Sequence, residues 1–172
     1  MCKSCEINPV YILTNKRRFC KRCFSRYIER RVLRAINRFS SEKSFFIKKS
    51  EKSPALIYIF KRLNFKINKK ENKGKTANSN CIDDTAVEII AAFMSRNMQL
   101  EKLNPSLKKE IMPFYFCLDK EIKLYASLHN IKLGEKAGER GLRRKVGNFL
   151  AEMEKKHPEI KNAIVNSLIS TS

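Results

Sequence analysis

Four cysteines near the N-terminus form the clearest chemical motif in this sequence of 172 residues. They come as two Cys-x2-Cys pairs separated by fourteen residues, and the four are Cys2, Cys5, Cys20 and Cys23. Two such pairs can place four thiolates around one zinc ion, and a unit this small needs the free energy of metal binding in order to fold. The sequence therefore predicts a structural zinc module over residues 1–24. A redox-active dithiol is the alternative.

The other two cysteines, Cys81 and Cys117, stand alone, and we expect packed thiols rather than metal ligands there. The sequence has no hydrophobic signal core and no apolar run close to the roughly 20 residues that span a bilayer. We therefore expect a cytoplasmic protein without a membrane partner, whose thiols stay reduced.

Positive charge dominates the composition. Thirty-seven Lys and Arg residues stand against 17 Asp and Glu, which gives a formal net charge of +20. An excess of this size indicates a polyanionic partner, first nucleic acid and second an anionic membrane surface. A compositional bias of the genome is the alternative explanation.

Residues 25–40 predict a basic helix. Apolar residues such as Phe24, Ile28 and Ile36 recur at helical spacing, and an arginine stands at every fourth position on the other side. Only Glu29 is available within the helix to balance these arginines, and like charges four residues apart repel each other. We interpret the row as a contact surface for RNA phosphates, an ordinary solvated face being the alternative. The predicted contacts are Lys21, Arg22, Arg26, Arg30, Arg34 and Arg38.

The rest of the chain, residues 41–172, predicts an α/β core. A short strand at 44–47, a loop at 48–53, a helix from Pro54 and a strand at 65–67 are typical of the start of a βαβ unit. The polar stretch 68–80 predicts a flexible linker, and helices are expected after it, in the C-terminal half. The predicted fold is a zinc ribbon followed by a Rossmann-like core dominated by helices.

Four segments, taken in order, resemble the cytoplasmic tRNA 2-thiolation family, the TtcA/NcsA-like enzymes of the ATP-pyrophosphatase (PP-loop) type. These segments are CKSC…CKRCF, FIKKSEKSPALIYIFKRLNF, NCIDDTAVEII, and DKEIKLYASLHNI followed by FLAEMEKKHPEIK. The resemblance implies an enzyme that places sulfur on a tRNA base. It also implies a glycine-rich SGGxDS loop whose backbone amides bind the pyrophosphate of ATP.

This chain departs from the family pattern at that loop. Only Ser53 agrees, and glycines are missing where successive N–H groups must turn towards one anion. The matching positions are Lys48, Lys49, Ser50, Glu51, Lys52 and Ser53. The polar stretch 68–80 stands where the family carries catalytic or iron–sulfur cysteines, and Asn80-Cys81 replaces a family His–Asn pair. The paired Asp83 and Asp84 remain, but both also suit the capping of a helix.

We therefore expect a shortened family member that binds neither ATP nor an iron–sulfur cluster. The family resemblance implies that its Rossmann-like core is truncated, with a remnant sheet of two or three strands that leaves an edge for a partner to cover. The hypothesis is a non-catalytic tRNA-binding accessory subunit that acts beside a catalytic thiolase paralogue. Arg143, which matches a family arginine, would form a second RNA-binding cluster with Arg144 and Lys145. The alternatives are an independent zinc-containing RNA-binding protein, for example on the ribosome, a sulfurtransferase that is active only with a partner, and a DNA-binding zinc-ribbon regulator.

Overall fold

The computed structural model describes residues 1, 2, 5, 7–13, 15–71, 74–96, 110–135, 138 and 141–170. The elements in chain order are β1 (Tyr11–Ile12), β2 (Arg18–Phe19), α1 (Lys21–Phe39), β3 (Ser44–Ile47), α2 (Ser53–Arg62), β4 (Lys66–Asn68), β5 (Lys75–Ala77), α3 (Ile82–Met94), β6 (Glu110–Ile111), α4 (Asp119–Leu128), α5 (Leu142–Lys156) and α6 (Ile160–Ser170). The mixed α/β class agrees with the sequence-based prediction.

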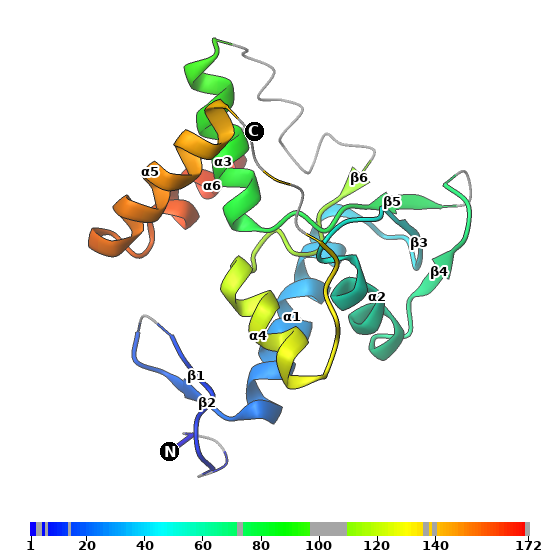
Figure 1. Ribbon diagram of the computed structural model, residues 1–172. Coiled ribbons are helices and arrows are strands. Elements are labelled where there is room, and N and C mark those ends of the chain that lie inside the picture. Colours follow the sequence, from blue (N-terminus) through cyan, green and yellow to red (C-terminus); the bar gives the residue numbers. More distant parts are fainter. Residues whose placement is uncertain are drawn as a thin grey trace.

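The N-terminal module is a small antiparallel hairpin, β1–β2, that leads directly into α1. The predicted basic helix is confirmed, and it begins at Lys21, earlier than expected. Its buried side contains Phe24, Ile28, Val32 and Ile36, because these residues share one face at helical spacing. In Figure 1 the hairpin lies at one end of the molecule and the large sheet lies on the opposite side.

The large sheet has four parallel strands in the order β4-β3-β5-β6. Two expectations are wrong here. Residues 75–77, inside the predicted linker 68–80, form β5 in the interior of the sheet, and the sheet exceeds the expected two or three strands. Each missed strand has only two or three residues, too few to show a hydrophobic period, and pairing with β3 and β6 holds β5 in place. The sequence leaves the secondary structure of residues 103–111 open, and of these only β6 is among the described residues.

The strand order reverses next to β3. The chain passes from β3 to β4 on one side and then returns to place β5 on the other side. In open α/β sheets such a reversal creates a crevice at the carboxyl ends of the two central strands, where ligands commonly bind. The loop after β3 (residues 48–52) and the segment after β5 (78–81) flank this crevice.

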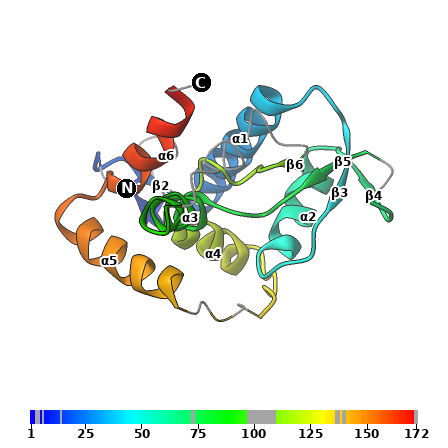
Figure 2. The same cartoon turned by 90° about the horizontal axis from the view of Figure 1, so that it is seen from above.

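Helices α3, α5 and α6 form a group beside the sheet, with α4 between this group and the hairpin (Figure 1), and the view from above shows the same separation of group and sheet (Figure 2). One contiguous set of buried side chains runs from Phe19 in the hairpin through Phe45 and Tyr125 to Val165 in α6. The metal-binding end and the sheet therefore share a core. None of the described helices is long and apolar enough to cross a membrane.

Candidate phosphate-loop cleft and metal centre

The loop between β3 and α2 closes on itself through serine contacts. The Ser53 hydroxyl donates to the carbonyl of Ser50 over 2.8 Å, and the Ser50 N–H donates to Ser53 Oγ over 3.2 Å. The described non-glycine residues with positive φ lie elsewhere, at Lys16, Asn64, Arg96 and Asn130. The loop therefore has the position of a ligand-binding loop in the fold without the left-handed backbone that aims successive amides at one phosphate.

Two other segments hold this loop from outside. The hydroxyls of Ser50 and Ser79 form a hydrogen bond across the reversal point, and the N–H of Gly134 donates to the carbonyl of Glu51 over 2.8 Å. A Cβ atom on Gly134 would lie 3.3 Å from both Glu51 Cα and the carbonyl oxygen of Ser50, so a larger residue would press on the loop. The Ser50–Ser79 and Gly134–Glu51 hydrogen bonds thus bridge the entrance of the crevice.

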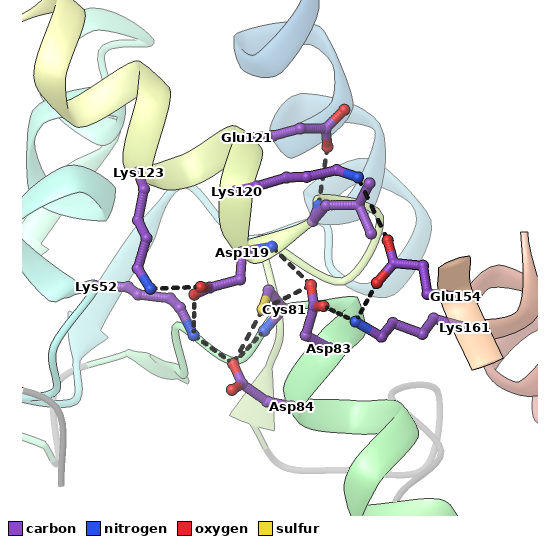
Figure 3. A network of polar contacts seen from close by, with 11 residues as sticks. Lys52, Cys81, Asp83, Asp84, Asp119, Lys120, Glu121, Lys123, Glu154 and Lys161 are labelled. Carbon is purple, nitrogen blue, oxygen red and sulfur yellow. Dashed lines mark hydrogen bonds and ion pairs between the residues drawn. The ribbon is translucent and has the colours of Figure 1, made fainter. Parts of the chain in front are cut away.

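Lys52 places a buried cation at the floor of the crevice. Its side chain is only 6% exposed, and Nζ lies 2.7 Å from Asp84 Oδ2 and 3.1 Å from Asp119 Oδ1 (Figure 3). Burial acts to lower the pKa of Lys52. The neighbouring Cys81, Asp84 and Asp119 groups raise it by a larger amount, so the net change is upward. The ammonium is therefore charged at neutral pH and bridges two carboxylates from α3 and α4.

Asp119 is held from a second side. Lys123 Nζ lies 2.7 Å from Asp119 Oδ2. Burial acts to raise the pKa of Asp119, whereas Lys123 and Lys52 lower it, and the net change is downward. A carboxylate between two ammonium groups remains ionised down to low pH.

Asp83 and Asp84, the paired aspartates of the sequence, have separate partners. Asp84 Oδ2 accepts the N–H of Cys81 over 2.9 Å, which confirms the predicted capping role for this residue. Asp83 binds Lys161 Nζ over 2.6 Å and accepts the N–H of Asp119 over 2.7 Å (Figure 3). Both carboxylates therefore serve contacts within the protein.

Cys81 is the N-cap residue of α3 and lies beside these aspartates. It is fully buried, and its thiol lies 3.1 Å from Asp84 Oδ2. Burial, together with the negative charge of Asp84, raises the pKa of this thiol well above its ordinary value. Cys117 is also buried, which raises its pKa to about 12. Both isolated cysteines are packed thiols, as expected, and a protonated thiol is a poor nucleophile.

Above this floor lies a cleft of about 670 Å³. Its lining mixes both charges and consists of Lys49, Ser50, Glu51, Lys52, Ser79, Asn80, Asp84, Val87, Glu88, Gly134, Glu135 and Arg143. Arg143 therefore belongs to the cleft, where its Nη2 lies 3.9 Å from Glu88 Oε1. Its side chain is nevertheless exposed, as are those of Arg144 and Lys145, its two neighbours in the predicted cluster.

The predicted metal ligands come together at the other end of the molecule. The Sγ atoms of the four N-terminal cysteines lie within 4.8 Å of one another. Cys20 immediately precedes α1 and Cys23 lies in its first turn, so the helix fixes one pair. Thiolates around one tetrahedral zinc ion are about 3.8 Å apart, given Zn–S bonds of about 2.3 Å. The group can hold a metal ion, and its spacing fits a single one.

The arginine row of α1 is exposed along its length, at positions 26, 30, 34 and 38. Glu29 does not neutralise it: its carboxylate accepts from Arg62 Nε over 2.6 Å and from the Tyr125 hydroxyl over 2.9 Å. Arg31 plays a different part, because it turns inward and pairs with the buried Glu121 at 3.1 Å. The row keeps an unbalanced positive charge towards solvent.

Sequence reasoning missed several members of the ionic network around Lys52. Asp119 was visible only as the start of a helix. Lys161, in α6, binds Asp83, and Glu154, in α5, forms an ion pair of 2.6 Å with Lys161. Burial lowers the pKa of Lys161, but Asp83 and Glu154 raise it to a larger extent. The two members of an ion pair in this network are up to 78 residues apart in the sequence, so no local sequence pattern predicts the pairing.

Neither the protein-family models nor the curated proteins that were searched match this sequence. Among solved structures, the chain is similar to the "U34-tRNA thiolase NcsA from Methanococcus maripaludis with its [4Fe-4S] cluster". The TM-score is 0.78 and the identity 14%, over 99% of this chain and 86% of the thiolase chain.

The comparison corrects one expectation. The sequence argued against an iron–sulfur cluster, but a thiolase of this fold carries one, and a set of four cysteines can ligate iron–sulfur clusters as well as zinc. Iron–sulfur is therefore a second candidate occupant of the metal centre. The resemblance to the tRNA thiolation enzymes holds at the level of the fold: this chain has the architecture of a U34-tRNA thiolase.

Proposed function

We propose that this chain is a non-catalytic, RNA-binding accessory subunit for tRNA thiolation. The thiolase-like fold, the net charge of +20 and the exposed arginine row support the link to tRNA. The proposal that the chain is non-catalytic rests on the position of Lys52. An ammonium between Asp84 and Asp119 occupies the floor of the crevice, in a loop without glycine.

The loop chemistry opposes binding of a triphosphate in two ways. No backbone amide nest is formed by the described loop residues, and Glu51 adds a carboxylate to the lining of the cleft. Asp83 and Asp84, which could otherwise hold a divalent cation, are paired with lysines at 2.6 and 2.7 Å. Binding Mg²⁺ there would require breaking buried ion pairs, which costs several kcal/mol.

In the metal centre we propose one structural zinc ion, held by Cys2, Cys5, Cys20 and Cys23. When bound, the metal links the hairpin to the start of α1 and supplies folding free energy to the module. Metal analysis of purified protein tests this: about one zinc per chain without absorption near 400 nm is expected. Detection of iron together with acid-labile sulfide would instead identify an iron–sulfur cluster as the occupant.

The RNA-binding part is tested by charge reversal on α1. The double variant Arg30→Glu, Arg34→Glu should weaken binding to a tRNA transcript by about 30-fold at moderate salt, because two phosphate contacts become repulsions. A matched control reverses two exposed cations near the sheet edge, Lys66→Glu and Lys69→Glu. Equal losses in the two variants would mean that only net charge matters and that the α1 surface has no special role.

The accessory role is tested in two further measurements. Incubation with ATP and tRNA should release no AMP above background, and AMP release would establish a catalytic chain. Affinity purification from the native cell should recover a full-length thiolase together with tRNA. Recovery of ribosomal RNA without a thiolase would favour an independent RNA-binding protein.

A further inference from the structure

A second cavity, of about 410 Å³, lies where the metal module meets the core. Four cationic side chains line it: Lys21, Arg22 and Arg26 from α1, and Arg62 from the end of α2. The remaining lining residues are Ile7, Cys20, Ser25 and His129, so none of the described residues that line the cavity carries a carboxylate. We call this cavity the basic pocket.

The cations of the basic pocket are largely unneutralised. Among the described residues, Lys21, Arg22 and Arg26 have no carboxylate partner within ion-pair distance, and Arg62 uses Nε for Glu29. Glu29 offsets the charge of Arg62, and a divalent metal with four thiolates, with a net charge of about −2, would offset only part of the three charges that remain. The remaining repulsion would be relieved by an anion in the pocket.

Hydroxyl and imidazole groups complete the lining in a defined arrangement. Ser25 Oγ donates to the carbonyl of Lys21 over 2.9 Å and lies 2.8 Å from His129 Nε2. His129 Nδ1 lies 3.2 Å from the Tyr58 hydroxyl. Burial, with Arg62 and Lys21 nearby, lowers the pKa of His129. The imidazole is thus neutral at pH 7 and fixed between α1 and α2.

We propose that the basic pocket binds one phosphate group of the RNA backbone and so fixes how the RNA lies across α1. The inference rests on the proposed RNA-binding function and goes further, because it assigns one phosphate to one pocket. Three guanidinium groups and an ammonium match the oxygens of a phosphate, and arginine can bind such an anion through two parallel hydrogen bonds. Arg62 and His129 would join the RNA contacts, which the spacing on α1 could not reveal.

The first test uses the histidines as reporters. The chain has two, His129 in the pocket and the exposed His157. Titration of the holo protein with inorganic phosphate, followed by NMR of the imidazoles, should shift the His129 signals and raise the pKa of His129, since a nearby anion favours the imidazolium. His157 serves as the internal control. Equal small changes at both histidines would overturn the pocket.

The second test compares two arginine pairs on the same helix. Arg22→Gln with Arg26→Gln removes two charges from the pocket, and Arg30→Gln with Arg34→Gln removes two exposed charges outside it. The pocket pair should lose about tenfold more affinity for a tRNA transcript, a difference of about 1.4 kcal/mol. Metal content and thermal unfolding verify that both variants are folded.

The results separate the two proposals. Equal losses in the two pairs, with no His129 response, would refute the pocket while leaving RNA binding intact. A His129 response to phosphate without any RNA binding would refute the proposed function and assign the pocket to a small phosphorylated ligand. Absence of both would refute both.

Discussion

The crevice at the strand reversal and the basic pocket both lie beside the start of a helix, but their charges are balanced differently. In the crevice, Lys52 faces Asp84 and Asp119 from within the chain. In the basic pocket, four cations share a lining whose described residues include no carboxylate, and only Arg62 among them is paired, with Glu29 outside the lining. A site whose charges are already paired gains little from an ionic ligand, whereas a site of like charges gains much. Open α/β folds commonly bind ligands at the crevice, but in this chain an ionic ligand would gain less electrostatic free energy there than in the basic pocket.

The largest effect should come from breaking the metal centre next to the basic pocket. Cys5→Ser should reduce bound metal from about one ion per chain to below about a tenth and unfold residues 1–24, because the metal supplies the folding free energy of the module. Elemental analysis and hydrogen exchange measure this. Cys81→Ser is the control, since that thiol is buried beside Asp84 and lies outside the metal group. Undiminished metal in Cys5→Ser would refute the four-thiolate site.

Removing the buried ammonium of Lys52 should destabilise the protein around the crevice. Lys52→Met leaves two carboxylates facing each other without their shared ammonium, which should cost about 3–5 kcal/mol in the free energy of unfolding. Urea denaturation at pH 7 measures it. Lys49→Met, an exposed neighbour in the same loop, should change stability by less than about 0.5 kcal/mol. A loss in Lys52→Met as small as that of the control would show that the ammonium does not hold the crevice together.

Acid should lower the free energy of unfolding by protonating carboxylates of the ionic network. The pKa of Asp119 is lowered although burial opposes this, and the pKa of Glu154 is lowered by Lys161 and Lys120 against burial. Groups whose pKa is lower in the folded state stabilise the fold above their unfolded values, which are near 4, and lose that contribution as the pH falls through the folded values. The free energy of unfolding should therefore decline below about pH 4.

The variant Lys161→Met sharpens this measurement. It removes one of the two lysines that lower the pKa of Glu154, so its stability should vary less with pH between about 4 and 2 than that of the unmodified protein. An unchanged acid profile in Lys161→Met would mean that Glu154 does not contribute through this pair.

The smallest effect concerns Arg143, which the sequence grouped with Arg144 and Lys145. Arg143 lines the crevice, and Glu88 lies 3.9 Å away and offsets part of its charge. Arg143→Gln should therefore change tRNA affinity by less than about twofold, and Arg144→Gln by somewhat more, since surface ion pairs are weak but still reduce the charge available to RNA. Filter binding at two salt concentrations compares the two variants. A larger loss at Arg143 would bring the crevice into the RNA-binding surface.

The local features of this protein follow from its sequence alone. Each Cys-x2-Cys pair, the apolar stripe of α1 and the exposed arginine row depend on successive residues three or four positions apart. The start of α2 at Ser53-Pro54 follows from the fixed φ of proline. Short-range geometry translates such patterns directly into structure.

The tertiary structure alone decided the character of both sites. β5 is three residues long, and only its pairing between β3 and β6 makes it a strand. Lys52 meets Asp84 across 32 residues, and the basic pocket also contains Arg62 from the end of α2 and His129 from the C-cap of α4. The free energy of an ion pair or a ladder hydrogen bond depends on the distance between groups in space, which the packing of the elements sets.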